Sequence, residues 1–513
     1  MNRRDFLFCA VAAAASSCHR AIASPAPEFS ADLTLQSDPS APMVPRTFTG
    51  LSYELAQLTD PTFFSRDNRD LVAYFRLLST NGVLRLGGNT SEFCWFKSSA
   101  SIAAPKLHVP PGNLDANWMP HQLFQINPEA IDALAGFLQA TGWRLIYGLN
   151  FGNSTPRRAA NEAAYVAQKI GDRLEFFQIG NEPDLYRNPS NGTRPPHWEF
   201  TDYVKEWAGF AAAIAATVPS ARFGGPDVAA SSDWITRFSA QVPPQLASRV
   251  VTLTGHYYAE GPPDDPRVTL QRLLAGNPRI SSETNQIVAA ARASRRTYRM
   301  TEGNSCYRGG KPGMSDAFAA ALWAGDYLLE LASLGCAGVN LHGGRSAFLT
   351  AGLGGHTPGM NVATTPQSVH SGFYSPIQSE PGREVKAMPV FYGMVLANQF
   401  SGAKMLRADC DLKGANATFY AARREPETLI AVFNKDELTP ISLTIRGLMN
   451  ATSASVWRMQ ASSLDATEGV TLAGAQIQPQ AKWSPRTTES LKVENEAAHL
   501  RVPNASAALV ILK

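Results

Sequence analysis

The chain has 513 residues, of which 44% are hydrophobic and 17% are charged, with 39 glycines and 35 prolines. This composition is typical of a globular protein and excludes disordered, collagen-like and coiled-coil chains. At about 100 to 200 residues per domain, with barrels allowed to run longer, the length predicts two or three domains. The 46 lysines and arginines against 43 acidic residues give a net charge of +3, so charge alone does not indicate a nucleic-acid, membrane-surface or polyanion partner.

The first segment has the pattern of an export signal. Arg3 and Arg4 precede an apolar run over 7–15, and an Ala-x-Ala pattern ends at Ala23. The apolar run is far shorter than the ~20 residues that cross a membrane. We therefore expect residues 1–23 to be a cleaved bacterial twin-arginine signal, and the mature protein to be periplasmic or secreted.

Apolar runs bounded by turn residues alternate with stretches of helical periodicity over most of the chain. Eight runs are expected to be strands: 47–53, 83–87, 144–149, 174–180, 221–225, 250–257, 297–301 and 337–341. Helices are expected over 70–79, 129–139, 158–170, 202–216 and 315–334, where apolar residues recur at 3.6-residue spacing. Strands and helices that alternate in this way predict an α/β fold, a (β/α)8 TIM barrel over residues 46–401.

The pattern changes after the barrel. Residues 402–513 contain short β-prone runs separated by turn residues, which predicts a C-terminal antiparallel β-sandwich. Phe29–Gln36 also alternates like a strand but precedes the first barrel strand, so we assign 28–45 to the same sandwich domain as 402–513. Gly343–Ser371 is a stretch of 29 residues rich in Gly, Ser and Thr, and it predicts an irregular loop after the eighth barrel strand.

Two glutamates follow barrel strands on the face where the active sites of barrels form. Glu182 lies in Asn181-Glu182-Pro183 at the end of the fourth predicted strand, and Glu302 follows the seventh. Because the loops at the carboxyl ends converge over a packed interior, we expect the two carboxyls to face each other across the mouth. Such a pair suits glycoside hydrolysis by one acid and one nucleophile. Without a metal-ligand motif or a phosphate-binding glycine loop, we expect no metal and no organic cofactor.

Three other polar residues stand at predicted strand ends. His256 and His342 lack the partners of a metal motif, so we expect them to hydrogen-bond to site residues. Asp227 carries no motif, and we expect it to be a surface carboxyl.

Seven motifs in chain order carry a resemblance to a known family. They are Gly50-Leu51-Ser52-Tyr53-Glu54, Arg85-Leu86-Gly87-Gly88-Asn89-Thr90, Gln178-Ile179-Gly180-Asn181-Glu182-Pro183-Asp184, Gly255-His256-Tyr257-Tyr258, Thr301-Glu302-Gly303-Asn304-Ser305, Asn340-Leu341-His342-Gly343-Gly344 and Tyr374-Ser375-Pro376-Ile377. In this order they resemble glycoside hydrolase family 79, the β-glucuronidase and heparanase family of retaining barrels. The resemblance covers nearly the whole mature chain.

The resemblance implies roles for nine residues. Glu182 would be the general acid/base and Glu302 the nucleophile. Asn181 would contact the sugar 2-hydroxyl, and Tyr258 would hydrogen-bond the nucleophile. The remaining substrate contacts would be Glu54 and Asn89 to hydroxyls on the far side of the ring, and Tyr307, Phe373 and Tyr374 to the uronate carboxylate. Tyrosine hydroxyls and backbone N–H groups can hold a carboxylate without an arginine.

The function implied by the resemblance is removal of terminal β-linked glucuronic acid, or its 4-O-methyl form, from glycans or glycosides by double displacement. Three alternatives stay open: an endo-acting, heparanase-like enzyme, a same-clan glycosidase for a neutral sugar, and a non-catalytic carbohydrate-binding protein. The small net charge favours removal of a single terminal sugar. The expected partner is a glucuronic-acid-containing glycan or glycoside, and neither nucleic acid nor a membrane is expected as a partner of the mature chain.

Overall fold

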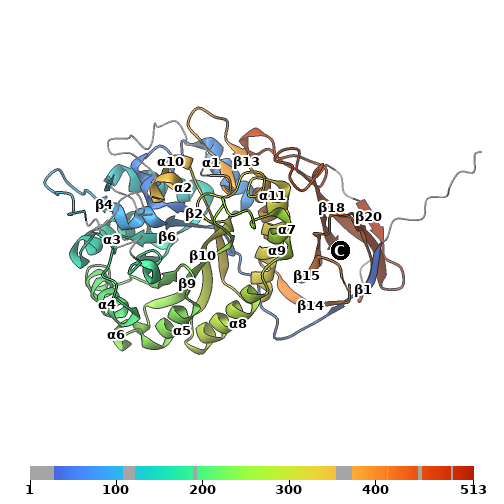
Figure 1. Ribbon diagram of the computed structural model, residues 1–513, viewed down its shortest axis with the longest axis horizontal. Helices are drawn as coiled ribbons and strands as arrows, with labels where there is room; N and C mark the ends of the chain where they lie inside the picture. The colour runs from blue at the N-terminus through green and yellow to red at the C-terminus, as the bar shows by residue number, and fades with distance from the viewer. Residues whose placement is uncertain are drawn as a thin grey trace, which may run out of the picture.

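The computed structural model describes residues 28–107, 122–188, 193–353, 372–412, 414–448, 453–486 and 489–513. The predicted signal at 1–23 lies outside these ranges, as does the 354–371 part of the predicted irregular loop. Figure 1 shows two units side by side, a barrel of strands and helices and a smaller β unit that contains the C-terminus.

Eight parallel strands of the described chain close into a barrel, as the sequence predicts. Around the barrel they stand in chain order, β2-β3-β6-β7-β8-β9-β10-β11. Their bounds are β2 (Thr49–Glu54), β3 (Val83–Gly87), β6 (Arg144–Leu149), β7 (Leu174–Ile179), β8 (Phe223–Val228), β9 (Val250–Glu260), β10 (Thr297–Cys306) and β11 (Gly338–Gly343). The fourth and seventh barrel strands, β7 and β10, are the ones predicted to carry the two glutamates.

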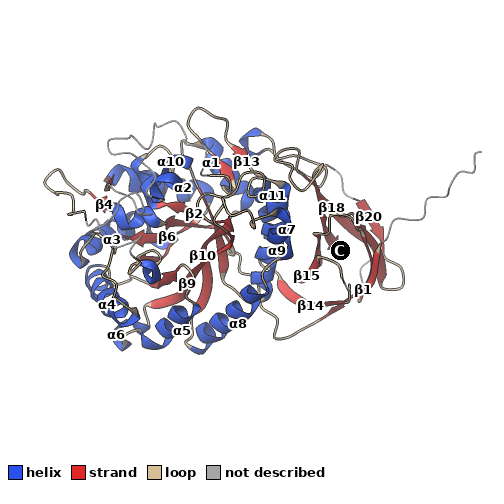
Figure 2. Cartoon of the chain, viewed as in Figure 1, coloured by secondary structure: helices blue, strands red, loops and turns tan. Residues whose placement is uncertain are grey.

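Helices cover the outside of the barrel (Figure 2). They are α1 (Arg69–Leu78), α2 (Pro128–Thr141), α3 (Pro156–Ile170), α4 (Phe200–Thr217), α5 (Ser232–Gln241), α6 (Pro244–Ala247), α7 (Leu270–Ala275), α8 (Pro278–Ala293), α9 (Phe318–Ser333) and α11 (Pro389–Asn398). Local sequence sets their ends: the Thr155 side chain caps α3 by accepting the N–H of Arg158 at 3.3 Å, and Gly142 ends α2 with φ 84°. Within the described residues, no helix is long and apolar enough to cross a membrane.

The stretch predicted to be irregular after the eighth strand begins with a helix, α10 (Ser346–Gly352). The expectation was wrong for this part because the helix is short and contains Ser, Thr and Gly, which are weak helix formers. Burial of Phe348 and Leu349 stabilises it instead. α10 packs against β2 and against the 3-10 helix η2 (Asn89–Phe93), so it lies over the barrel mouth.

The second unit is a sandwich formed by one continuous sheet, which has ten strands within the described residues. Its order is β19-β18-β22-β16-β15-β14-β1-β17-β21, with β20 paired to β18. β1 pairs antiparallel with β14 and parallel with β17, so the sheet is antiparallel except at that edge of β1. The bounds are β1 (Phe29–Gln36), β14 (Lys404–Cys410), β15 (Ala417–Arg424), β16 (Glu427–Asn434), β17 (Ile441–Arg446), β18 (Ser453–Gln460), β19 (Thr471–Leu472), β20 (Glu489–Lys492), β21 (Ala497–Val502) and β22 (Ser506–Leu512).

The sandwich docks on the barrel through a buried ion pair. Asp326 on α9 pairs with Lys435 and accepts the hydroxyls of Thr418 and Tyr420 at 2.6 Å each. Figure 1 places α9 and α11 at this boundary. Because breaking a buried ion pair leaves an unpaired buried charge, the contact holds the two units in one arrangement.

Candidate active site

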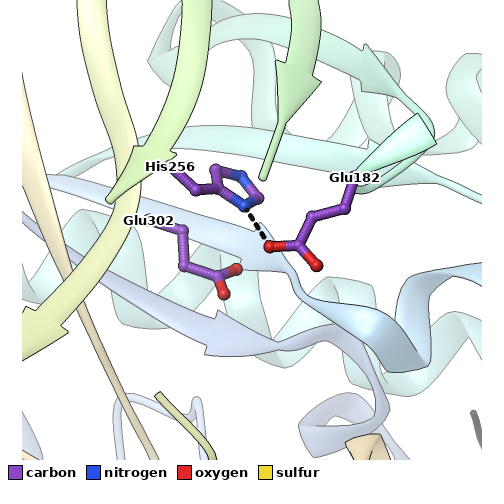
Figure 3. A group of neighbouring side chains, drawn as sticks. All are labelled: Glu182, His256 and Glu302. Carbon is purple, nitrogen blue, oxygen red and sulfur yellow. Dashed lines mark hydrogen bonds and ion pairs between the residues drawn. The ribbon is translucent and has the colours of Figure 1, made fainter. Parts of the chain in front are cut away.

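The two glutamates meet at the carboxyl ends of β7 and β10. Glu182 follows β7 and precedes the 3-10 helix η5 (Pro183–Leu185), whereas Glu302 lies within β10. One oxygen of each carboxylate and a ring nitrogen of His256 all lie within 4.8 Å of one another. Figure 3 shows both carboxylates and the imidazole converging on one space.

Glu302 is surrounded by positive charge and hydrogen-bond donors. The Tyr258 hydroxyl donates to Oε1 at 2.8 Å, and the Arg85 guanidinium donates to Oε2 at 2.6 Å. His342 Nδ1 lies 3.8 Å from Oε2. Burial by itself would raise the pKa of Glu302, but the charges of His342, His256 and the guanidinium lower it to about 2. The carboxyl is therefore anionic at neutral and mildly acidic pH.

Arg85 is buried beneath the site, and all five of its N–H groups are used. Its acceptors are Gln178 (2.8 Å), Ser52 (3.0 Å), Glu302 (2.6 Å), Asn181 (2.7 Å) and Asp227 (2.7 Å). No N–H of Arg85 is left for a substrate carboxylate. Its role is to fix the side chains that surround it and to hold Glu302 ionised.

Asp227, expected at the surface, is buried in this network, so that expectation was wrong. It is 1% exposed, pairs with Arg85, accepts the Thr301 hydroxyl at 2.5 Å and lies 3.1 Å from His256 Nε2. Burial opposes its ionisation, but the charges of Arg85 and His256 hold its pKa well below the usual range. No local motif marks an inward-facing carboxyl whose partner lies 142 residues away in the chain.

Glu182 has fewer partners than Glu302. Among the described residues, the one hydrogen-bond partner of its carboxyl group is His256, whose Nδ1 lies 3.0 Å from Oε1. Burial raises the pKa of Glu182, His256 lowers it and the charge of Glu302 raises it, and the net direction is upward. The backbone of Glu182 is left-handed, with φ 51°, a strained conformation that is common at functional sites.

His256 connects Glu182 to Asp227 and is fully buried. Burial lowers its pKa, but the charges of Asp227 and Glu302 outweigh burial and raise it to about 10. The imidazole is therefore protonated, hydrogen-bonded to Glu182 through Nδ1 and ion-paired with Asp227 through Nε2. Glu182, His256 and Glu302 are close enough to surround an ion, but both ring nitrogens of His256 already lie against the carboxylates of Glu182 and Asp227.

Asn181 and Asn89, both predicted to contact the sugar, are joined to each other. Asn181 Nδ2 donates to Asn89 Oδ1 at 3.0 Å, and Asn89 Nδ2 donates to the Gly352 carbonyl of α10 at 3.0 Å. The backbone N–H of Asn181 donates to Glu92 at 2.7 Å. Both amide groups are therefore held in fixed orientations before any ligand binds.

Glu54, the third predicted sugar contact on this side, is buried at the end of β2. Its Oε2 accepts the N–H and the hydroxyl of Thr90 at 2.8 and 2.6 Å, and its Oε1 lies 3.6 Å from His342 Nε2. Gly88 has φ 68°, and a Cβ there would lie 2.5 Å from the Glu54 carboxylate, so this position needs glycine. A Cβ on Gly352 would lie 2.6 Å from Glu54 Oε1, so α10 closes the site beyond Glu54.

Tyr307 and Tyr374, both predicted to hold the uronate carboxylate, lie next to Tyr258. The Tyr258 ring lies 6.4 Å from the Tyr307 ring and 6.1 Å from the Tyr374 ring. Asn304 on β10 donates to the Tyr374 carbonyl at 2.9 Å, which fixes the segment that also contains the half-buried Phe373. The structure therefore brings all three predicted carboxylate contacts to the Glu302 end of the site.

Two further carboxylates, the buried Glu92 and the half-buried Asp184, hold the loops of the site, and sequence analysis did not identify them. Glu92 accepts backbone N–H groups from Phe151, Gly152 and Asn181. Asp184 accepts those of Ala229, Ala230 and Ser231. Burial raises the pKa of both carboxyls. The position of Asp184 directly after Asn-Glu-Pro was a usable signal, whereas Glu92 is recognised only from the loops that converge on it.

Comparison with known proteins shows which proteins the chain is similar to. No family model matches the chain. A β-glucuronidase of Aspergillus niger is 28% identical over 337 residues, which cover 60% of the chain and 60% of that protein. A β-glucuronidase of Neurospora crassa is 27% identical over 352 residues, which cover 62% of the chain and 60% of that protein.

The chain is related to these β-glucuronidases. The resemblance predicted from the seven motifs is thereby confirmed. The matched part spans 60% of the length of each curated β-glucuronidase.

Solved structures match the fold over nearly the whole chain. A 4-O-α-L-rhamnosyl-β-D-glucuronidase of Fusarium oxysporum superposes with a TM-score of 0.71 at 19% identity, covering 94% of this chain and all of that one. A family 51 arabinofuranosidase of Xanthomonas axonopodis pv. citri superposes with a TM-score of 0.63 at 14% identity, covering 95% of this chain and all of that one. These matches confirm the predicted barrel with a β-sandwich.

Proposed function

We propose that the chain is a retaining glycoside hydrolase that removes terminal β-linked glucuronate from a glycan or glycoside. The carboxylate pair carries the proposal, because oxygens of Glu182 and Glu302 approach within 4.8 Å and their pKa values shift in opposite directions. Retaining enzymes place their carboxyls about 5 to 5.5 Å apart, whereas inverting enzymes need about 6.5 to 9.5 Å for a water. The relationship to β-glucuronidases supports glucuronate as the sugar that is removed.

In the first step, Glu302 attacks the anomeric carbon while Glu182 donates its proton to the glycosidic oxygen. The bond from that carbon to the oxygen breaks, the aglycone leaves as an alcohol, and a glycosyl ester forms on Glu302. The lowered pKa of Glu302 keeps the nucleophile ionised, and the upward shift in the pKa of Glu182 favours the protonated form that an acid needs.

In the second step, Glu182 acts as a base on a water that attacks the same carbon and releases Glu302. Forming the ester removes the negative charge from Glu302, and that charge had raised the pKa of Glu182. The pKa of Glu182 therefore falls when a base is needed. The protonated His256, 3.0 Å away, stabilises the carboxylate that results. Two inversions at one carbon give a product with the β configuration.

Recognition of the sugar follows the predicted roles. Tyr307 and Tyr374, with the backbone at Phe373, bind the uronate carboxylate, and their position around Tyr258 supports this assignment. Asn181 donates to the 2-hydroxyl, and Asn89 and Glu54 bind hydroxyls further along the ring. Contact of α10 with Glu54 supports release of a single terminal sugar rather than cleavage within a chain. Export by the signal at 1–23 is part of the same proposal.

Hydrolysis of 4-nitrophenyl β-glucuronide beside the matching β-glucoside and β-xyloside tests this function. We expect the glucuronide to be preferred, with the β anomer formed first as seen by NMR. Preference for a neutral glycoside would contradict the glycone assignment, and a first-formed α anomer would contradict retention. Binding of the glycosides without turnover of any of them would instead support a carbohydrate-binding protein.

A further inference from the structure

The proposed reaction gives no role to Asp227, a carboxylate that lies directly beside Glu182 in the fold. Its backbone carbonyl accepts the N–H of Glu182 at 2.9 Å. Its backbone is left-handed, with φ 63°, and its side chain is buried. A non-glycine residue in this conformation is strained, and such strain persists only where the surrounding structure holds it, most often at functional sites. Asp227 is therefore held in place against the residue proposed as the acid/base.

Side chains of alternating charge join the two glutamates through Asp227. Arg85 donates to Glu302 at 2.6 Å and to Asp227 Oδ2 at 2.7 Å. On the other side, Asp227 Oδ1 lies 3.1 Å from His256 Nε2. His256 Nδ1 lies 3.0 Å from Glu182 Oε1, the contact drawn in Figure 3. Asp227 is therefore bound between the cation that serves Glu302 and the cation that serves Glu182.

Three carboxyl groups face the imidazole of His256, those of Asp227, Glu302 and Glu182, and Asp184 lies within electrostatic reach. Burial lowers the pKa of His256, but the charges of Asp227 and Glu302 raise it to about 10. When the glycosyl ester forms, Glu302 loses its charge. Among the described residues, Asp227 is then the one carboxylate besides Glu182 itself that contacts the imidazole.

After the first step, the pair formed by Glu182 and His256 shares one proton. Glu182 has given its own proton to the leaving alcohol, so the remaining proton either stays on His256 or moves across 3.0 Å to Glu182. Only the first arrangement leaves a carboxylate that can take a proton from water. Burial favours the second, in which neither group is charged. A negative charge on the far side of the imidazole favours the first, and Asp227 supplies it 3.1 Å from Nε2.

We propose that Asp227 is a positioning residue for the second step of the reaction: its carboxylate keeps the shared proton on His256 and so leaves Glu182 free to act as the base. The inference rests on the proposed retaining mechanism. In that step, the oxygen of a water forms a bond to the anomeric carbon, and a proton of the water passes to Glu182. The bond from that carbon to Glu302 breaks, and its electron pair returns to the carboxylate. Asp227 acts through His256 and does not enter the step itself.

Asp227→Asn removes the charge and keeps the shape of the side chain. The substrate for the test is 2,4-dinitrophenyl β-glucuronide, because its good leaving group makes the first step fast and the second step limiting. We expect kcat to fall about 10- to 100-fold, part of the factor that a general base contributes. KM should fall with it, so that kcat/KM changes much less. Stopped flow should show a burst of dinitrophenolate. Azide, which needs no base, should restore kcat and give the β-glucuronosyl azide.

The pH profile separates this role from a structural one. In Asp227→Asn the shared proton must leave Glu182 before the base exists, so the acid limb of kcat should move to higher pH. The acid limb of kcat/KM, which Glu302 sets, should stay in place. Asp233→Asn is the control, because Asp233 is an exposed aspartate on α5, the helix after β8, and it should keep the wild-type values. An equal loss in kcat and kcat/KM without a burst would overturn the proposal and leave the β-glucuronidase function standing.

A measurement without turnover locates the proton itself. In Glu302→Gln the side chain at this position is uncharged, like the ester of the intermediate. Nitrogen-15 NMR of the full chain with labelled histidine, assigned with His256→Gln, reports whether the imidazole is protonated. We expect an imidazolium at pH 7 in Glu302→Gln and a neutral imidazole when Asp227→Asn is added. A neutral His256 in Glu302→Gln would overturn the proposal even if Asp227→Asn does not fold, and so would an imidazolium in both variants.

Failure of the proposed function gives a different result. If the wild type cleaves a neutral dinitrophenyl glycoside and no glucuronide, the glucuronate assignment is contradicted, and the same kinetic tests of Asp227 apply to that substrate. If it cleaves no glycoside, the hydrolase function is contradicted, and the NMR measurement decides whether Asp227 keeps the proton on His256.

Discussion

The two ends of the active site contain the same side chain in opposite electrostatic settings. At one end, Glu302 accepts hydrogen bonds from a guanidinium and a phenol, with two histidines nearby, and its pKa falls to about 2. At the other, Glu182 has one imidazolium partner and faces the charge of Glu302, and its pKa rises. Burial acts on both carboxyls in the same direction, so the number and position of the cations separate the two pKa values, and under the proposed mechanism they make Glu302 the nucleophile and Glu182 the acid.

Removing the carboxylate of Glu302, the proposed nucleophile, should have the largest effect. We expect Glu302→Gly to lower kcat/KM by about 10⁴-fold or more, because no covalent intermediate can form. Added azide should restore turnover and give the α-glucuronosyl azide, since azide enters from the face that Glu302 occupied. The control is Glu283→Gln on α8, a half-buried glutamate that pairs with Arg279 away from the site, and it should keep wild-type activity. Near-normal activity of Glu302→Gly without azide would remove the assignment.

Removing the acid should have an effect that depends on the leaving group. For Glu182→Gln, we expect a loss of about 10²- to 10⁴-fold with an alkyl glucuronide, which needs a proton on its leaving oxygen. A 2,4-dinitrophenyl glucuronide needs little protonation and should react with a much smaller loss in the glycosylation step, measured as kcat/KM. An equal loss with both substrates would show that Glu182 is not the acid.

A milder substitution tests how hydrogen bonding sets the pKa of Glu302. Tyr258→Phe removes one donor to the carboxylate, so the pKa of Glu302 should rise from about 2. Because Glu302 acts in its ionised form, activity should be lost at higher pH than in the wild type as the solution is acidified. The measurement is the acid limb of kcat/KM against pH. Tyr257→Phe removes a neighbouring hydroxyl that is not part of the hydrogen bond between Tyr258 and Glu302, and it should leave that limb in place.

Glu162 is a buried carboxyl away from the active site, and it tests how burial shifts a pKa there. Glu162 on α3 accepts the Tyr147 hydroxyl at 2.8 Å, and burial raises its pKa from 4.5 to about 7. Between pH 4.5 and about pH 7 the unfolded chain loses a proton that the folded chain keeps. The free energy of unfolding therefore falls as pH rises through this range, by about 3 kcal/mol in total. Glu162→Gln should therefore be more stable than the wild type at pH 8 and about equal at pH 4.5 in urea unfolding. An exposed control, Glu384→Gln, should show no such trend.

Most of the fold could be predicted from the sequence because its signals are local. The eight apolar runs became the eight barrel strands, and the five periodic stretches became α1, α2, α3, α4 and α9. α10 was missed because its helix depends on burial of Phe348 and Leu349 rather than on propensity. The pairing of β14 with β1 inside the sandwich sheet joins residues more than 370 positions apart, so no local pattern predicts it.

The sequence by itself determined the order of strands and helices, the presence of Glu182 and Glu302 at the ends of the fourth and seventh barrel strands, and the relationship to β-glucuronidases. These follow from local periodicity and from short contiguous motifs. The tertiary structure alone decided that Asp227 is buried and that all five N–H groups of Arg85 are used inside the site. Electrostatic interactions depend on distance in space, and residues far apart in the chain come within hydrogen-bonding reach only when the barrel closes.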